Sequence, residues 1–116
     1  MVVDFLTSDR ADLVFGALAD ATRRDIVATA LGGELSVSAL GRRYPMSLTA
    51  IQKHVAVLER AGLVHKRRQG REQLVSTDMA AVRDAGRLLD RFEALWLERL
   101  GRFSDVLAQQ PQGGNE

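Results

Sequence analysis

The sequence contains no cysteine, and this absence excludes disulfide bonds, thiolate metal sites and thiol nucleophiles. No apolar run is long enough to span a bilayer, so no membrane partner is expected. The first ten residues carry Asp4 and no basic stretch, and they therefore do not look like a secretory signal. We expect a cytoplasmic protein whose 116 residues form one domain, because a second core would have too little to bury.

Acidic charge is almost missing from one part of the chain, although the net charge of the whole is only +1. Between residues 42 and 71 there are eight basic side chains and a single acid, Glu59, which makes this segment +7 and leaves −6 for the remainder. Such a division predicts that one face of the protein meets a polyanion. A solvated basic loop without a partner is the alternative.

Capping residues divide the first third of the chain into short helices. Ser8 can cap a first helix, and either Asp20 or Thr22 can open a second, which the Gly32–Gly33 pair ends. Each helix has an apolar face: Leu13, Val14, Ala17 and Leu18 in the first, and Ile26, Val27, Ala30 and Leu31 in the second. Both faces are predicted to turn towards one core.

The stretch Glu34–Leu40, ELSVSAL, begins the next helix. Ser36 stands where an N-cap belongs, and Leu35 and Leu40 have the spacing of a hydrophobic staple. Pro45 closes this helix because it disfavours helical geometry at the residue before it.

The same pattern returns in a helix predicted over residues 47–61, with Ser47 as its cap and Gly62 as its stop. Its inward stripe has the spacing i, i+4, i+7: Ile51, Val55 and Leu58. Two short helices joined by a tight turn form a helix-turn-helix pattern. Two strands are then predicted over residues 63–69 and 72–77, around a turn at Gly70.

A long final helix is predicted from about Met79 to about Leu107, and residues 108–116 are predicted to form a disordered tail. The fold class is therefore mainly α (α+β). We expect a winged helix-turn-helix of about five helices, with a two-stranded β-hairpin wing, residues 63–77, between helices 4 and 5. Residues 1–107 are expected to form a single domain with dimerisation helices at both ends.

Two segments resemble one family of proteins. ADATRRDIV, residues 19–27, is similar to the LADPTRRRIL opening of the ArsR-type bacterial transcriptional regulators, with Ala21 in place of proline. MSLTAIQKHVAVLERAGLV, residues 46–64, resembles the recognition-helix segment of that family, which ends in EAGLV. The similarity extends over residues 13–77, and it implies a dimeric DNA-binding regulator.

The stretch ELSVSAL also resembles the ELCVC box with which the metal-sensing members of this family bind thiophilic ions. Ser36 and Ser38 occupy the two cysteine positions, and a hydroxyl is a poor ligand for soft metals. The final helix carries carboxylates but no histidine for the family's second kind of metal site. We therefore expect no metal and no thiolate sensing, with Ser36 as an N-cap and Ser38 as a first-turn residue.

The outward side of helix 47–61 is expected to lie in the major groove. Gln52 can make a bidentate contact with an adenine edge, while Thr49 can reach a base or a phosphate. His54 either faces a DNA phosphate or satisfies an internal hydrogen bond, and the sequence leaves both open. The DNA-binding set predicted for this helix is Ser47, Thr49, Gln52, Lys53 and His54.

Basic side chains outside this helix complete the predicted DNA surface. Those of the wing can track phosphates or enter the minor groove. Two more end the preceding helix, where cations are favoured even without DNA. The residues are Lys66, Arg67, Arg68 and Arg71 in the wing, and Arg42 and Arg43 before the turn.

The final helix has an apolar stripe with spacings of mostly three and four residues: Leu89, Phe92, Trp96, Leu100 and Phe103. We expect this stripe to form a homodimer, with Leu13 and Val14 of the first helix as a second contribution. A two-fold dimer would place two recognition helices about 34 Å apart on double-stranded DNA, which predicts an imperfect palindromic operator. The alternative is a helix that folds back on its own core and leaves a monomer.

These features favour a sequence-specific transcriptional regulator, and the resemblance implies a repressor of its own operon. The second possibility is a winged helix used for protein contact or as a non-specific architectural DNA binder. Thr49 and Gln52 favour sequence-specific readout over this possibility. No Gly-rich phosphate loop, paired-carboxylate cleft or Ser-His-acid set is recognisable, so an enzyme is not expected. The sequence indicates no cofactor and no particular small-molecule effector.

Overall fold

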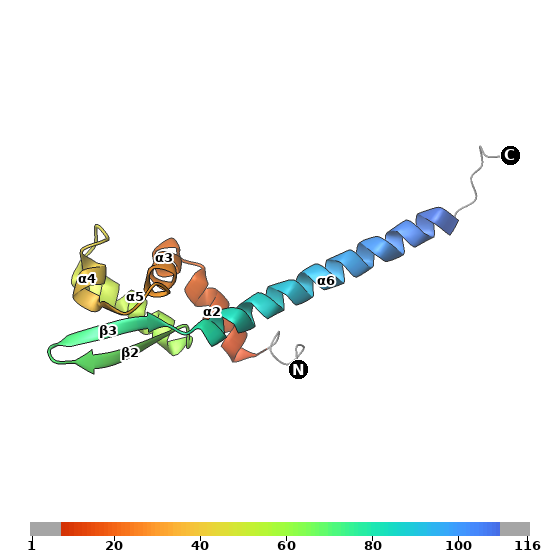
Figure 1. Cartoon of the computed structure of the whole chain (residues 1–116). Coiled ribbons are helices and arrows are strands. Elements are labelled where there is room, and N and C mark those ends of the chain that lie inside the picture. The colour runs from red at the N-terminus through yellow and green to blue at the C-terminus, as the bar shows by residue number, and fades with distance from the viewer. Residues whose placement is uncertain (1–7, 110–116) are drawn as a thin grey trace.

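The computed structural model describes residues 8–109, in which five helices and three strands form a winged helix-turn-helix (Figure 1). The helices are α2 (Asp9–Leu18), α3 (Ala21–Ala30), α4 (Val37–Gly41), α5 (Leu48–Arg60) and α6 (Met79–Gln109), and the strands are β1 (Leu35–Ser36), β2 (Val64–Gln69) and β3 (Glu72–Thr77). The predicted fold class is confirmed. Most of the predicted tail lies outside the described residues, and its first two residues, Ala108 and Gln109, belong to α6.

Serine and aspartate side chains begin the helices as predicted. The carboxylate of Asp20 accepts a hydrogen bond from the backbone N–H of Arg23 at 3.0 Å, so Asp20 rather than Thr22 caps α3. Helix α5 ends shortly before Gly62, whose φ of +77° is a conformation that favours glycine. The remaining caps, on α2, α4 and α5, are Ser8, Ser36 and Ser47.

A hydrophobic core fills the space between the helices and the sheet. The predicted stripe of α5 is fully buried in it: Ile51, Val55 and Leu58. Two residues expected on the inward faces are exposed instead. Leu13 is 38% exposed because α2 turns Val14 and Ala17 inward, and Leu31 is exposed because it follows the last turn of α3.

The sheet is antiparallel, with the strand order β1-β3-β2. Its hairpin of β2 and β3 matches the predicted wing, except that β2 begins one residue later, at Val64. The sequence missed β1, which pairs Leu35 with Val75 and Ser36 with Leu74. A strand of two residues directly before a helix is too short to leave a periodic pattern. Through β1, the wing is joined at its base to the helix-turn-helix.

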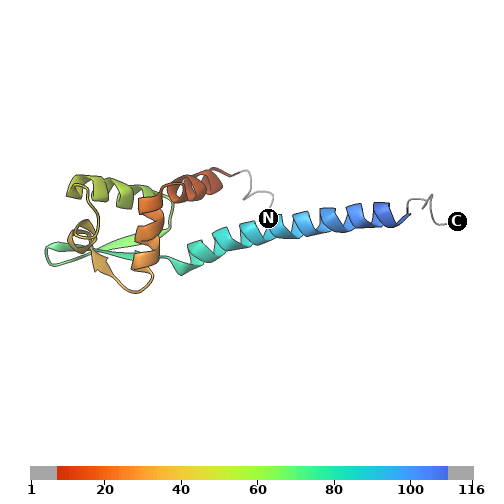
Figure 2. The same cartoon turned by 90° about the horizontal axis from the view of Figure 1, so that it is seen from above.

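Helix α6 leaves the body of the protein and projects away from it, as Figures 1 and 2 show from two directions. Within its described length, only Ala85 and Leu88, near its start, are buried. Every residue from 89 to 109 is exposed, so the helix does not fold back on its own core. Among residues 8–109, no helix is both long enough and apolar enough to cross a membrane.

Candidate nucleic-acid interface

The outward face of α5 carries the polar side chains that the sequence assigned to it. Thr49, Gln52 and Lys53 are exposed, opposite the buried stripe. The hydroxyl of Ser47 accepts a hydrogen bond from the backbone N–H of Ala50 at 3.1 Å, which leaves its own hydrogen free to be donated. A helix with this face can present several hydrogen-bonding groups to the edges of base pairs.

A hollow of about 400 Å³ separates α5 from the wing. Gln52 enters it from α5, and Lys66 and Arg68 from β2, while Arg71 stands at the turn of the hairpin. The structure thus brings together four of the predicted DNA-binding residues. The other residues that line the hollow are Val37, Ser38, Leu48, Val55, Glu72 and Gln73.

Arg67 does not join the other wing cations. Its Nε donates to Glu34 Oε2 and its Nη2 to Glu34 Oε1, both at 2.7 Å. Side chains alternate between the two faces of a strand, so Arg67 points away from the face that holds Lys66 and Arg68. The hydrogen bonds from Arg67 hold the pKa of the Glu34 carboxyl below its usual value, and Glu34 raises the pKa of Arg67. In this structure Arg67 ties β2 to the segment before β1, and its charge is already balanced by Glu34.

The remaining wing cations differ in how far their charge is already balanced. Lys66 Nζ lies 3.3 Å from the carboxylate of Glu59, the acid that interrupts the basic segment. Arg68 and Arg71 make no ion pair with any of the described residues. Arg68 and Arg71 are thus the cations best placed to meet an anion in the hollow.

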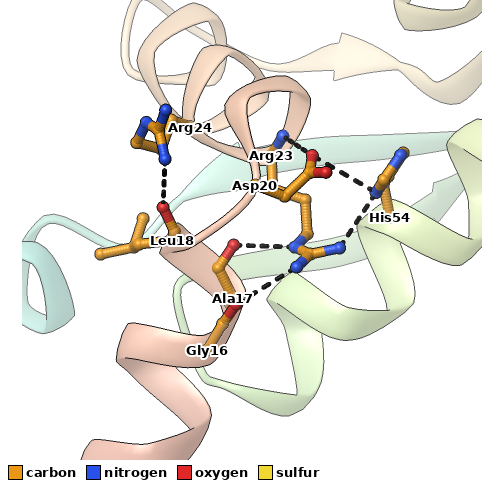
Figure 3. Close-up of polar contacts among 7 residues, drawn as sticks. All are labelled: Gly16, Ala17, Leu18, Asp20, Arg23, Arg24 and His54. Atoms are coloured by element: carbon orange, nitrogen blue, oxygen red, sulfur yellow. Dashed lines mark hydrogen bonds and ion pairs between the residues drawn. The ribbon is translucent and has the colours of Figure 1, made fainter.

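The side chain of His54 extends from α5 towards the start of α3 (Figure 3). Of the two orientations that the sequence left open, the structure has the internal one. Nδ1 of His54 is 3.3 Å from Nη1 of Arg23 and accepts a hydrogen bond there, because an arginine only donates. The carboxylate of Asp20 is 3.9 Å from the same nitrogen, which is too far for a hydrogen bond. With a side chain only 21% exposed, His54 belongs to this internal contact rather than to the DNA surface.

Arg23 also donates hydrogen bonds to the C-terminal end of α2 (Figure 3). Nε of Arg23 donates to the carbonyl oxygen of Ala17 at 2.7 Å, and Nη2 donates to that of Gly16 at 3.2 Å. Arg24 donates to the carbonyl oxygen of Leu18 at 2.7 Å. These carbonyls lie in the last turn of α2, where the helix supplies few partners, and the two arginines donate to them. The carbonyl of Gly16 also accepts a hydrogen bond from the backbone N–H of Ala19 at 3.3 Å. The backbone N–H of Arg23, with His54 nearby, lowers the pKa of the Asp20 carboxyl.

Another histidine contact joins the wing to α6. His65 Nε2 lies 2.7 Å from the carboxylate of Asp78, which also accepts a hydrogen bond from the backbone N–H of Ala81. The N–H of Ala81 and the ring of His65 lower the pKa of the Asp78 carboxyl. Residues 8–109 contain no group of three or more His, Cys, Asp or Glu side chains that could hold a metal ion.

The residues predicted for the dimer interface fall into two groups. On α6 they form an exposed apolar face, in which Trp96 is 59% and Phe103 is 61% exposed. Leu13 of α2 is also exposed, but Val14 is only 3% exposed and packs in the core of its own chain. The prediction for Val14 is corrected, because a side chain already buried within one chain has little surface left for a second. The others on α6 are Leu89, Phe92 and Leu100, which are exposed as well.

Comparison with known proteins gives consistent matches. The family profile described as "Helix-turn-helix domain" matches residues 18–67. The HTH-type transcriptional regulator Rv2034 of Mycobacterium tuberculosis is 38% identical over 99 residues, which cover 83% of this chain and 87% of the relative. The solved structure of an ArsR-like transcriptional regulator from Rhodococcus sp. RHA1 has a TM-score of 0.74 at 34% identity, with 84% of this chain and 92% of that chain covered. The homodimeric winged helix-turn-helix DNA-binding domain of Mb0332 from Mycobacterium bovis, a possible ArsR-family regulator, has a TM-score of 0.59 at 30% identity, with 79% and 82% covered.

Proposed function

Because this chain belongs to the ArsR-type family of winged helix-turn-helix transcriptional regulators, we propose that it is a sequence-specific repressor that binds double-stranded DNA as a homodimer. The observation that carries the proposal is the hollow in which Gln52 meets Lys66, Arg68 and Arg71. It places a side chain that can read a base next to side chains that can hold phosphates.

In the proposed complex, α5 lies in the major groove and the wing follows the backbone beside it. Gln52 reads a base edge, Thr49 reaches a base or a phosphate, and Lys53 binds a phosphate. Ser47 donates its hydroxyl to a phosphate, and Arg42 and Arg43 approach the backbone from the end of α4. Arg67 and His54 are left out of this set, because their side chains are engaged within the protein.

The proposed dimer is held together mainly by α6, with Leu13 of α2 as a smaller contribution. The apolar face of α6, which includes Trp96, projects from the body, and no other part of residues 8–109 covers it. A large continuous apolar surface that is exposed to solvent marks an interaction site. The Mycobacterium bovis domain, which has a similar fold, is homodimeric, and this supports the same assembly here. A two-fold dimer presents α5 twice, so the operator is an imperfect palindrome.

Repression follows from occupancy, because a dimer bound across a promoter excludes RNA polymerase from the same stretch of DNA. In an in vitro transcription assay, the purified protein is expected to reduce the transcript from its own promoter region. An increase in that transcript would show that the protein is an activator rather than a repressor, and it would leave the proposal of DNA binding intact.

Specific DNA binding is tested by competition. A footprint on the DNA upstream of the protein's own gene supplies the operator, which then competes against a random duplex of equal length at one fixed salt concentration. We expect the operator to bind at least about a thousandfold more tightly, as is usual for specific sites. Equal competition by both duplexes would show an architectural, non-specific binder instead. Gln52→Ala is the matched variant, and it should reduce the preference for the operator more than it reduces binding to random DNA.

A further inference from the structure

The two serines of the stretch Glu34–Leu40 have different surroundings. Ser36 is buried, and its hydroxyl accepts a hydrogen bond from the backbone N–H of Ala39 at 3.0 Å. Ser38 is exposed on α4, and its hydroxyl makes no hydrogen bond with any of the described residues. The fold therefore accounts for Ser36 and leaves Ser38 without a structural role.

Ser38 faces the hollow between α5 and the wing. Gln52 stands on one wall of this hollow, Lys66 and Arg68 stand on another, and Ser38 is on a third wall, formed by α4. Among the described residues that line the hollow, Ser38 is the only one with a hydroxyl group. A DNA strand that meets both Gln52 and the wing cations has to pass between these walls, within reach of α4.

We propose that Ser38 is a further DNA-contacting residue, which donates its hydroxyl to a phosphate of the strand that lies in this hollow. This inference rests on the proposed DNA-binding function. Phosphate oxygens accept hydrogen bonds but do not donate them, and a hydroxyl supplies the matching donor. The neighbouring side chains of Val37 and Leu48 are apolar and supply no donor.

The charge balance of the hollow gives the proposal a second consequence. Lys66 already faces Glu59, which leaves Arg68 and Arg71 as the cations of the hollow that have no ion pair among the described residues. A further negative charge at position 38 would pair with Arg68 and repel the phosphate that Ser38 is proposed to bind. Position 38 is therefore a point at which one added negative charge blocks the DNA site.

The test compares Ser38→Ala, Ser38→Thr and Ser38→Asp with the wild type, on operator and on random DNA. Alanine is a good helix former, so Ser38→Ala keeps α4 while it removes the hydroxyl. We expect it to lose about 10-fold in affinity on both DNAs, because a phosphate contact is independent of sequence. Ser38→Thr keeps the hydroxyl and should stay within about threefold of the wild type. Ser38→Asp should lose at least about 30-fold, because like charges placed together at an interface are costly.

Gln69→Glu is the matched control for charge, because Gln69 contacts Arg67 on the opposite face of the wing. It adds the same charge as Ser38→Asp, and it should weaken binding by less than about threefold because that charge is distant and screened. Equal thermal midpoints would exclude unfolding as the cause of a loss. Should Ser38→Asp fail to fold, the pair Ser38→Ala and Ser38→Thr decides the question. If Ser38→Ala bound DNA as tightly as the wild type, the proposed contact of Ser38 would be wrong. If the wild type itself showed no preference for the operator, the proposed function would be wrong.

Discussion

Replacing Arg68 with glutamine removes a cation from the hollow beside Gln52, whereas the same change at Arg67 removes a cation that is already bound to a carboxylate. Arg68 makes no ion pair with the described residues, while Arg67 donates two hydrogen bonds of 2.7 Å to Glu34. An arginine paired in this way adds almost no net charge to the surface. The two neighbouring arginines should therefore differ in how they affect the salt dependence of DNA binding.

The size of the difference follows from the release of counterions. Each phosphate that the protein neutralises contributes about 0.9 to the slope of log affinity against log salt concentration. The proposed dimer contains Arg68 twice, so Arg68→Gln should flatten the slope by about 1.8. The matched control is the double variant Arg67→Gln with Glu34→Gln, which removes the ion pair at constant net charge. It should change the slope by less than about 0.5.

Fluorescence anisotropy with a labelled operator duplex measures these slopes at salt concentrations from about 50 to about 300 mM. The double variant is preferred to Arg67→Gln alone, which would leave the Glu34 carboxylate unpaired near the DNA. If the double variant flattened the slope as much as Arg68→Gln does, the wing would meet DNA through its opposite face. An unchanged slope for Arg68→Gln would show that no phosphate lies in the hollow.

Further substitutions test other parts of the same arrangement. Glu59→Gln frees Lys66 from its ion pair and should raise affinity for both operator and random DNA by about two- to fivefold in the same assay, a range typical of exposed charges. Trp96→Glu should weaken the dimer by about 2 kcal/mol or more, which is about 30-fold in its dissociation constant, and sedimentation equilibrium at several concentrations would detect this. Asp78→Asn should lower the urea midpoint at neutral pH, because the lowered pKa of Asp78 means that its carboxylate stabilises the fold above the unfolded-state pKa near 3.8. That stabilisation is lost as the pH falls through the folded-state pKa, so the two proteins should converge in strongly acidic urea titrations.

Features that act within a few residues could be predicted from the sequence. The caps at Ser36 and Ser47 and the turn at Gly70 depend on local hydrogen bonds and local dihedral angles, and each was found where it was expected. The stripe of α5 was equally clear, because its residues have the spacing i, i+4, i+7 of one helical face and polar residues stand opposite it. The sequence also indicates that Lys66 and Arg68 lie on the same face of β2, because side chains alternate between the two faces of a strand.

Partners from distant segments could not be predicted. Arg67 binds Glu34, which is 33 residues away, and His54 contacts Arg23, which is 31 residues away. Nothing in the spacing of either pair indicates that the fold brings them together. Val14 was misplaced for another reason. Leu13 and Val14 are adjacent apolar residues near the edge of a helical face, and only the packing of α2 decides which of them enters the core.

A dimer that reads DNA with two copies of α5 has to keep them at a fixed separation, because equivalent major-groove faces recur about every 34 Å. The surfaces proposed for dimerisation lie on α6 and α2, whereas the residues proposed to read the bases lie on α5. Arg23 connects these two parts, since it donates to the carbonyls of Gly16 and Ala17 at the end of α2 and contacts His54 on α5. Gln52 is two residues from His54, so a rotation of α5 that redirected Gln52 would break this contact as well. The segment 19–27, which resembles the opening motif of the family and has no DNA contact in the proposed complex, thus links the reading helix α5 to α2, one of the two helices of the proposed dimer.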